Sequence, residues 1–328
     1  MKKILNRLFE YGSLSEVEAR ETLTKLAQGE FNPSQIAAFL TVYSMRSITV
    51  EELTGFRDAM LELCLRIDLD DFDAMDLCGT GGDGQDTFNI STLSSFIVAG
   101  AGQNVAKHGN NGVSSVCGSS NLMAHFGYDF TNDVDTLKRN LEEAGICFIH
   151  APLFHPAMKN VAPIRRELGV KTFFNMLGPM VNPSFPKKQI VGVFSLEIAR
   201  LYGYLYQQTD KQFAILHSLD IYDEISLTSP FKMITKDAEK LLKPEDLGLN
   251  YQTKESLFGG GSIAESAKIF TDILENKGTE PQKQAVLANA GVAIATGKGL
   301  PLIEGVAQAK ESLESGAALN SFKKLIAQ

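Results

Sequence analysis

A glycine-rich loop, Gly79 to Gly84, follows an apolar run directly and precedes a helix-like segment. Glycines after a strand let the backbone approach a phosphate closely, and the N-terminus of the next helix attracts anions. Asn89, Ser91 or Thr92 could cap that helix. The loop is not a Walker A loop, which would end in Gly-Lys-Ser/Thr. A tight β-α turn is the simpler alternative, but Asp83, Asn89 and Ser91 exceed what a turn requires, which favours phosphate binding.

A second candidate follows the next apolar run, over the segment 107–115 and then Gly118-Ser119-Ser120. Here Lys107 stands at a strand's C-terminal end beside glycines and hydroxyls, which is where ligands of open α/β sheets bind. Lys107 could hold a diphosphate while backbone N–H groups and serines take the remaining oxygens. Alternatively, Lys107 and His108 are ordinary exposed loop residues.

A third candidate is the adjacent carboxylate pair Asp223-Glu224, which follows a predicted strand end beside Ser226 and His217. Hard carboxylate oxygens suit Mg²⁺, which commonly binds through one or two carboxylates together with substrate phosphates. Acidic pairs are more often surface turns. The pair becomes a candidate only in the company of the two phosphate-type loops.

The elements that must position these residues begin with a helical segment. Ser15 with Glu18, Asn32 with Gln35, and Thr49 with Glu52 have capping-box spacing. Pro33 stands at the favoured first helical position, and Gly29 can terminate the preceding helix. Three short helices ending by about Leu65 predict a small helical domain over 1–70.

After Asp70, short apolar runs alternate with glycine-rich turns and helices, which is typical of a parallel α/β sheet over 71–328. The segment from Thr92 to Ala101 reads as a helix, and small residues such as Ala288 and Gly291 allow close packing in the helical part after about Ser262. Strands are predicted at 75–78, 104–107, 146–149, 190–194, 213–216 and 231–234.

Composition narrows the class of protein. A chain of 328 residues exceeds one usual core and suggests two units, with room for a cleft between them. The net charge of −8 disfavours a nucleic-acid or anionic-membrane partner.

Four scattered cysteines form no Cys-x-x-Cys pair and indicate reduced thiols. No run approaches the ~18 apolar residues of a membrane span, and the N-terminus lacks a signal core. Cytoplasm follows by elimination.

The two loops resemble those of the anthranilate phosphoribosyltransferase family, which carry Gly-Thr-Gly-Gly-Asp, Asn-x-Ser-Thr and Lys-His-Gly-Asn. All three motifs stand here unchanged, at 79–83, 89–92 and 107–110. The resemblance extends across nearly the whole chain. It includes 35–40, similar to the family's N-terminal helix, and 165–169, 174–179 and 182–183, similar to its hinge-side motif.

The resemblance implies transfer of the phosphoribosyl group of 5-phosphoribosyl 1-diphosphate (PRPP) to anthranilate in tryptophan biosynthesis, with Mg²⁺ as cofactor. It implies a homodimer that forms through the helical domain. Residues 160–185 would contribute hinge-side helices to this domain. Asp223, Glu224 and Ser91 would hold magnesium, while Gly79, Asn110 and Arg165 would contact anthranilate. The residues implied for PRPP are Gly79, Gly82, Asp83, Thr87, Asn89, Ile90, Ser91, Thr92, Lys107, His108, Gly109, Asn110, Asn111, Gly112, Val113, Ser114, Ser115 and Ser119.

The chain departs from the family pattern in places. Ser120-Asn121 replace a common Ala-Asp, Ser218 and Ile221 stand where glycines are common, and Lys171 replaces a frequent arginine. Arg166, unlike Arg165, is interpreted as a solvated residue at a helix C-terminus. Two alternatives remain open: a pyrimidine nucleoside phosphorylase, whose Ser-Thr-Gly-Gly after Lys-His is absent here, and a non-catalytic relative that binds nucleic acid.

Overall fold

The computed structural model describes residues 1–112 and 116–327. These residues form two compact units. The helical unit combines Met1–Ile67 with Ala151–Phe185, and the α/β unit combines Asp68–His150 with Pro186–Gln328. The second segment of the helical unit therefore starts at Ala151, earlier than the expected residue 160.

The helical unit is built from the capped helices that the sequence predicts. Side-chain and backbone capping bonds are both present at Ser15, Asn32 and Thr49. Phe173, from the second segment, stacks on Phe56 with ring centroids 4.4 Å apart, so the two segments share one core. The helices of this unit are α1 (Lys2–Phe9), α2 (Glu16–Ala27), α3 (Pro33–Met45), α4 (Val50–Leu63), α8 (Ala151–Phe154), α9 (Ala162–Leu168) and α10 (Phe174–Leu177), with 3₁₀ turns η2 (Pro156–Asn160) and η3 (Gly178–Val181).

The described residues of the α/β unit form a seven-stranded sheet in the order β3-β2-β1-β4-β5-β6-β7. The first five strands are parallel, and the last two pair antiparallel at one edge. This confirms the predicted fold class of a small helical domain with a larger, mainly parallel α/β domain. The strands are β1 (Met75–Leu77), β2 (Val105–Gly109), β3 (Ile146–His150), β4 (Lys188–Gly192), β5 (Gln212–Ser218), β6 (Phe231–Ile234) and β7 (Glu239–Leu242).

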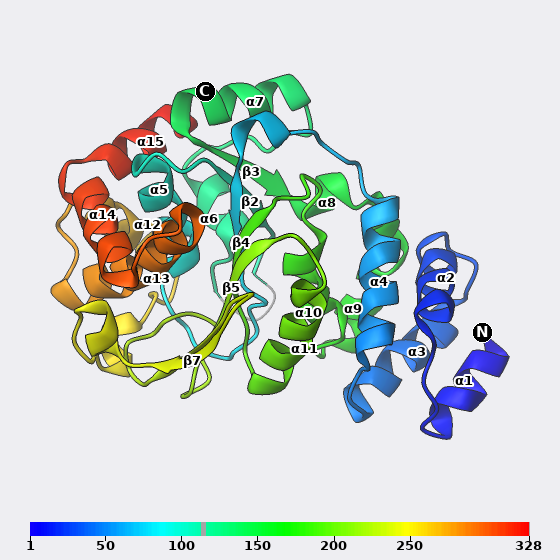
Figure 1. The fold of residues 1–328 in the computed structure, drawn as a ribbon. Coiled ribbons are helices and arrows are strands. Elements are labelled where there is room, and N and C mark those ends of the chain that lie inside the picture. The colour runs from blue at the N-terminus through cyan, green and yellow to red at the C-terminus, as the bar shows by residue number, and fades with distance from the viewer. Residues whose placement is uncertain (113–115, 328) are drawn as a thin grey trace. The chain divides into compact units, whose positions relative to one another are not determined.

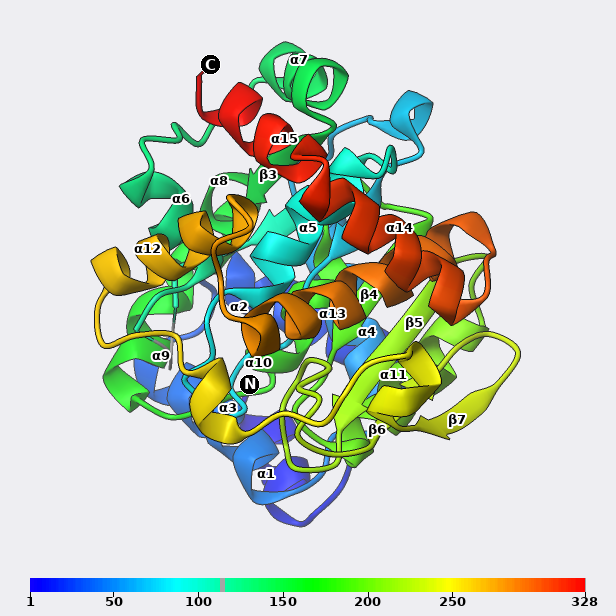
Figure 2. The ribbon, with the colours of Figure 1, turned by 90° about the vertical axis from the view of Figure 1, so that its left-hand side faces the viewer.

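Helices cover both faces of this sheet. Figure 1 shows α5, α13, α14 and α15 on one side and α11 on the other, and Figure 2 shows the first group lying across the strands. Phe96, Phe270 and Phe322 pack edge to face among these helices. The helices of this unit are α5 (Ile90–Gly100), α6 (Ser119–His125), α7 (Val134–Ala144), α11 (Leu196–Gln207), α12 (Ile263–Leu274), α13 (Glu280–Lys298), α14 (Leu302–Glu314) and α15 (Ala317–Ile326), with η1 (Asp70–Phe72), η4 (Pro244–Leu247) and η5 (Lys254–Leu257).

Several boundary expectations need correction: β1 ends at Leu77 instead of Cys78, β4 spans Lys188–Gly192 instead of 190–194, and β5 spans Gln212–Ser218 instead of 213–216. Helix α5 begins at Ile90 instead of Thr92, and β2 continues to Gly109 instead of ending at Lys107. Strand β7 was not predicted, because Glu239-Lys240-Leu241-Leu242 is exposed edge sequence with little apolar alternation. The expected close packing after Ser262 is present: a Cβ on Gly291 of α13 would lie 2.5 Å from Val306 Cγ2 of α14.

Among the described residues no single helix has both the length and the apolar character of a membrane span. By length and composition alone, α13 and α14 meet these criteria as a pair, bent by 116° at their junction.

Candidate active site

The three candidate loops meet at one edge of the sheet. Parallel strands β1, β2 and β5 all point their C-terminal ends to the same edge, where the loops after them begin. The chain runs from β1 outward to β2 and β3, then returns to β4 on the other side of β1. Such a reversal of strand order is the topological switch point at which open α/β sheets bind ligands.

The first loop depends on glycine for its backbone conformation. Gly81, Gly82 and Gly84 have φ of 61°, 76° and 75°, in the left-handed region that a side chain disfavours. The N–H of Thr80 donates to the Gly192 carbonyl at the end of β4 (2.9 Å), which fixes the start of the loop. Its end is held by a bond from Gly259 N–H to the Asp86 carbonyl (2.7 Å).

The helix that follows this loop is not capped as the sequence suggests. Asn89 occupies the N-cap position of α5, but its side chain makes no capping bond and donates instead to the Cys117 carbonyl (2.9 Å). The N–H of Ser91 donates to Glu224 Oε1 (2.9 Å). A carboxylate from a distant loop therefore occupies the helix N-terminus, where negative charge is stabilised. The expectation that Asn89, Ser91 or Thr92 caps this helix through its own side chain finds no support.

Ile90 and Thr92, which lie in the first turn of α5, are deeply buried. Ile90 is part of the core, and its N–H already donates to the Phe88 carbonyl (2.5 Å). The Thr92 hydroxyl is buried with no hydrogen-bond partner within the described chain, as is that of Thr80. An unsatisfied buried hydroxyl costs about 1–3 kcal/mol.

The carboxylate pair Asp223-Glu224, called the acidic doublet from here on, contacts the first loop directly. Asp223 Oδ2 accepts a bond from Gly81 N–H (2.6 Å), and the Asp223 N–H donates to Asp83 Oδ2 (3.4 Å). Burial, reinforced by the charge of Asp83, raises the pKa of Asp223 to about 7. Burial, and then the charge of Asp223, also raises the pKa of Glu224 well above its ordinary value. The surface-turn interpretation is therefore wrong, because Asp223 is buried within the site.

Lys107 adds the cation of the site. It lies in β2 and is only 2% exposed, so the view of Lys107 as an exposed loop residue is wrong. Its Nζ donates to the Leu77 carbonyl (2.5 Å) and to Ser91 Oγ (3.3 Å). Burial lowers the pKa of Lys107. His108 is buried as well, and its N–H donates to Asp76 Oδ1 (3.0 Å).

The second loop is held by the residues that depart from the family pattern. Asn121 Oδ1 accepts bonds from Gly112 N–H (2.8 Å) and Gly118 N–H (3.1 Å). The Asn110 carbonyl accepts from Ser119 Oγ (3.4 Å), and the Asn111 N–H donates to the Asn110 side chain (2.8 Å). An amide at position 121 thus supplies the acceptor that this loop needs. Of the predicted residues, Val113, Ser114 and Ser115 lie outside the described residues.

Arg165 lies in the helical unit, whereas every other predicted site residue that the structure describes lies in the α/β unit. Its guanidinium carbon is 5.1 Å from the centroid of the Phe174 ring, and Nη2 lies 3.4 Å from Asn175 Oδ1. Within the described ranges no carboxylate lies within ion-pair distance of Arg165, and partial burial lowers its pKa. A partly buried, stacked guanidinium suits a planar carboxylate ligand.

The chemistry of the acidic doublet suits a magnesium ion, although protein side chains alone would not complete the ion's coordination. In the described part of the chain no cluster of three or more His, Cys, Asp or Glu side chains has the arrangement of a metal site. Asp223 and Glu224 supply two hard carboxylates, and burial, followed by the negative charge of neighbouring carboxylates, raises the pKa of both. Two carboxylates completed by water and phosphate are the usual protein contribution to Mg²⁺ binding.

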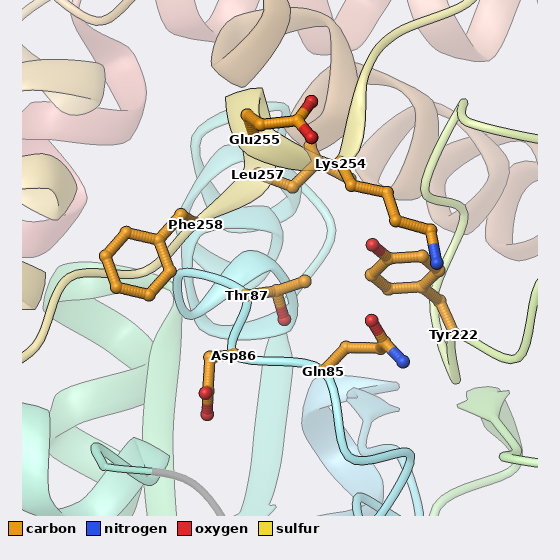
Figure 3. A pocket seen from close by; sticks show the side chains of 8 residues that line it. All are labelled: Gln85, Asp86, Thr87, Tyr222, Lys254, Glu255, Leu257 and Phe258. Carbon is orange, nitrogen blue, oxygen red and sulfur yellow. The ribbon is translucent and has the colours of Figure 1, made fainter.

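A hollow of about 440 Å³ is lined by Gln85 and Thr87, which follow the first loop, and by Tyr222, which precedes the doublet. Figure 3 shows Thr87 and Gln85 facing Lys254 and Tyr222 across it. Lys254 Nζ lies 5.8 Å from the centroid of the Tyr222 ring. Thr87, one of the predicted PRPP residues, therefore faces open space beside the loop instead of the protein core.

Sequence reasoning missed three residues that hold the doublet. Asn289 bonds both backbone polar groups of Ile225, Ser218 bonds the Glu224 carbonyl, and Gly192 leaves room for the Asp223 backbone. Asn289 could have been found, since it is the one polar residue in the apolar run from Ala285 to Ala295. Gly192 and Ser218 carry no comparable signal.

The comparisons with known proteins follow the same two-unit division. Residues 2–64 match the model of the glycosyl transferase family, helical bundle domain, and residues 71–319 match the a/b domain of that family. A relative from Christiangramia forsetii is 60% identical over 99% of this chain and 98% of its own length. One from Flavobacterium psychrophilum is 62% identical over the same shares. Both are named anthranilate phosphoribosyltransferase.

Solved structures give the same result. The anthranilate phosphoribosyltransferase of Thermus thermophilus superposes with a TM-score of 0.91 at 33% identity, covering 98% of both chains. That of Saccharomyces cerevisiae, solved in complex with PRPP and Mg, has a TM-score of 0.91 at 27% identity and covers 98% of this chain and 96% of its own. These matches do not support the nucleoside phosphorylase or the nucleic-acid-binding alternative. The chain belongs to the anthranilate phosphoribosyltransferase family of glycosyl transferases.

Proposed function

We propose that this enzyme joins the amine of anthranilate to the ribose C1 of PRPP and releases pyrophosphate, as a step of tryptophan biosynthesis. The observation that carries the proposal is the convergence of three loops. Asp223 bonds Gly81, Glu224 bonds Ser91, and Lys107 reaches Ser91 as well. Two phosphate-type loops and a carboxylate pair at one sheet edge are what a metal-bound sugar diphosphate requires.

In the proposal, PRPP is held by the two loops together. The Gly79–Asp83 loop and the N-terminus of α5 would lie beside the diphosphate, and Lys107 would supply a buried positive charge. Thr87 lines the adjoining hollow, which gives the substrate room beside the loop. Asn110, Asn111, Gly112 and Ser119 would complete the contacts, with Val113 to Ser115.

The chemistry is a displacement at C1 with positive charge on the ribose and negative charge gathering on the leaving diphosphate. Lys107 stabilises that negative charge, and such fixed electrostatic stabilisation is commonly the largest catalytic contribution. The neutral anthranilate amine is already a nucleophile, so the site needs no strong base. Holding two substrates in line supplies much of the remaining acceleration.

Magnesium belongs to this proposal. Asp223, Glu224 and Ser91 are the residues that would hold it. The ion would neutralise charge on the diphosphate. Support comes from the raised pKa values of both carboxylates, which deprotonate readily once a cation is near.

Anthranilate recognition is assigned to Arg165, Gly79 and Asn110. Arg165 supports this assignment because its stacked guanidinium forms no ion pair within the described residues. A guanidinium binds a carboxylate with two parallel hydrogen bonds, which a lysine cannot reproduce.

The reaction can be tested by the fluorescence change as anthranilate is consumed with PRPP and Mg²⁺. We expect turnover with all three components and none when PRPP is replaced by inorganic phosphate. Phosphorolysis of thymidine by the same preparation, without anthranilate turnover, would overturn the proposal.

A homodimer in the cytoplasm completes the proposal. The helical unit exposes Phe9, Tyr11 and Met45, with 57%, 78% and 74% of their surfaces accessible, and such apolar exposure suits a protein interface. The four cysteines, Cys64, Cys78, Cys117 and Cys147, are free thiols, as in reducing compartments. Light scattering should give twice the chain mass, and Met45→Glu should shift it toward the monomer. A wild-type monomer would contradict the dimer.

A further inference from the structure

Asn289 is a buried amide in an otherwise apolar helix. It lies in α13 between Ala285 and Ala295, a run that is buried throughout, and it is itself only 6% exposed. Burying an amide costs free energy unless its hydrogen bonds are made. Its position in this run therefore requires partners that a methyl or isobutyl group could not replace.

Those partners are the backbone groups that directly follow the acidic doublet. Asn289 Oδ1 accepts from the Ile225 N–H (3.0 Å), and Nδ2 donates to the Ile225 carbonyl (2.9 Å). Nδ2 also donates to the Ala285 carbonyl one turn earlier (2.9 Å), which fixes the orientation of the amide. Both polar groups of one loop residue are thus bound to a rigid, buried helix.

Ser218 holds the same loop from the end of β5. Its hydroxyl donates to the Glu224 carbonyl (2.6 Å) and accepts from the Ser226 N–H (3.2 Å). The loop needs such support, because Ile221 and Leu227 on either side of the doublet have left-handed φ of 78° and 61°. Backbone bonds at Glu224 and Ile225 hold the loop where the Glu224 carboxylate accepts the Ser91 N–H at the N-terminus of α5.

We infer that Asn289 and Ser218 are positioning residues that hold the Asp223-Glu224 doublet for the metal-bound diphosphate. The inference rests on the proposed function, since it takes the doublet as the magnesium site. Both side chains bond the loop backbone. Each acts through the loop backbone, as residues that orient metal ligands commonly do.

The test measures metal binding directly, with Mn²⁺ as the probe and the free Mn²⁺ signal in electron paramagnetic resonance as readout. We expect Asn289→Ala to weaken Mn²⁺ binding about 10-fold, the usual range for residues that orient ligands. Asn140→Ala is the matched control. Asn140 is a buried amide of α7 that donates to the Tyr128 hydroxyl (3.0 Å), far along the chain from the doublet. It should lower the melting temperature and leave Mn²⁺ affinity unchanged.

Ser218→Ala provides a second variant in case Asn289→Ala folds poorly, since it removes one hydroxyl and leaves α13 intact. Both variants should raise the Mg²⁺ concentration for half-maximal activity and leave kcat at saturating Mg²⁺ nearly unchanged. Wild-type Mn²⁺ affinity in both variants overturns the inference. Asp223→Asn distinguishes failure of the positioning inference from failure of the proposed magnesium site. If this variant binds Mn²⁺ as tightly as the wild type, the proposed magnesium site is wrong.

Discussion

The carbonyl oxygen of Asp223 lies against Gly192, in the place where a side chain would begin. A Cβ built on Gly192 would stand 1.4 Å from that oxygen. Gly192 ends β4 and also accepts the bond from Thr80 N–H that starts the first loop. One glycine therefore brings the phosphate loop and the acidic doublet together at the switch point of the sheet.

Gly192→Ala should remove activity by displacing the doublet. The added methyl must push the Asp223 backbone away, at a cost of about 1–3 kcal/mol or more for overpacking. We expect Mg²⁺-dependent turnover to fall at least 100-fold in fluorescence assays, with a lowered melting temperature. Gly203→Ala in α11 is the control, because its Cβ would meet only Ile234 methyl groups at 3.6 Å or beyond. Equal activity in the two variants would refute this account of Gly192.

Lys107→Met should abolish efficient use of PRPP without unfolding the enzyme. The side chain is nearly isosteric, and it removes a charge whose burial is costly, so the free energy of unfolding should not fall strongly. Removing one stabiliser of transition-state charge costs about 100- to 1,000-fold in rate. Steady-state kinetics should show this loss in kcat/KM for PRPP. Near-normal kinetics would remove Lys107 from the proposed mechanism.

The sequence predicted the loops better than it predicted what holds them. Local glycine and strand patterns singled out both candidate loops, and the company of these loops made the doublet a candidate. The links from Asn289 to Ile225 and from Glu224 to Ser91 join residues far apart in the chain. No local periodicity encodes such pairs. For the same reason Lys107 resembled a loop lysine, since only the sheet shows that β2 continues past it.

The raised pKa of Asp223 predicts a pH dependence of metal binding. A carboxyl group that titrates at about 7 in the folded protein holds its proton below that pH, and Mg²⁺ must displace it. Metal affinity should therefore rise with pH through this range, by about 10-fold per pH unit for each proton that the metal displaces. Titration of the substrate-free enzyme with Mn²⁺ at several pH values measures this directly.

The raised pKa of Asp223 has the opposite effect on the stability of the metal-free protein, which should fall as pH rises. Because the folded pKa of Asp223 lies above the unfolded value of 3.8, this group destabilises the fold increasingly as pH rises from about 4 to about 7. Asp223→Asn should flatten both profiles. A Mn²⁺ affinity that stays constant across this range would contradict the buried, protonated state of Asp223.

Ile221→Gly should stabilise the protein. Ile221 has φ of 78° and is half exposed, so a left-handed backbone is imposed on a β-branched residue with little burial in return. Left-handed backbone costs such a residue about 1–2 kcal/mol, and the added freedom of glycine in the unfolded chain offsets about half of that. Thermal denaturation should show a rise of a few degrees. Leu227→Gly shares the positive φ but removes a fully buried side chain, so it should destabilise. A decrease for both would show that strain at Ile221 is unimportant.

Arg165→Lys should impair anthranilate binding selectively. The guanidinium stacks over Phe174, and its planar donors match a carboxylate in a way that an ammonium cannot. We expect KM for anthranilate to rise about 10-fold, the scale of one charge-assisted bond, with KM for PRPP unchanged. The exposed Arg166→Lys serves as control. With 2-aminobenzamide, which lacks the carboxylate, wild type and Arg165→Lys should differ little. A difference as large as that with anthranilate would mean that Arg165 acts on something other than the carboxylate.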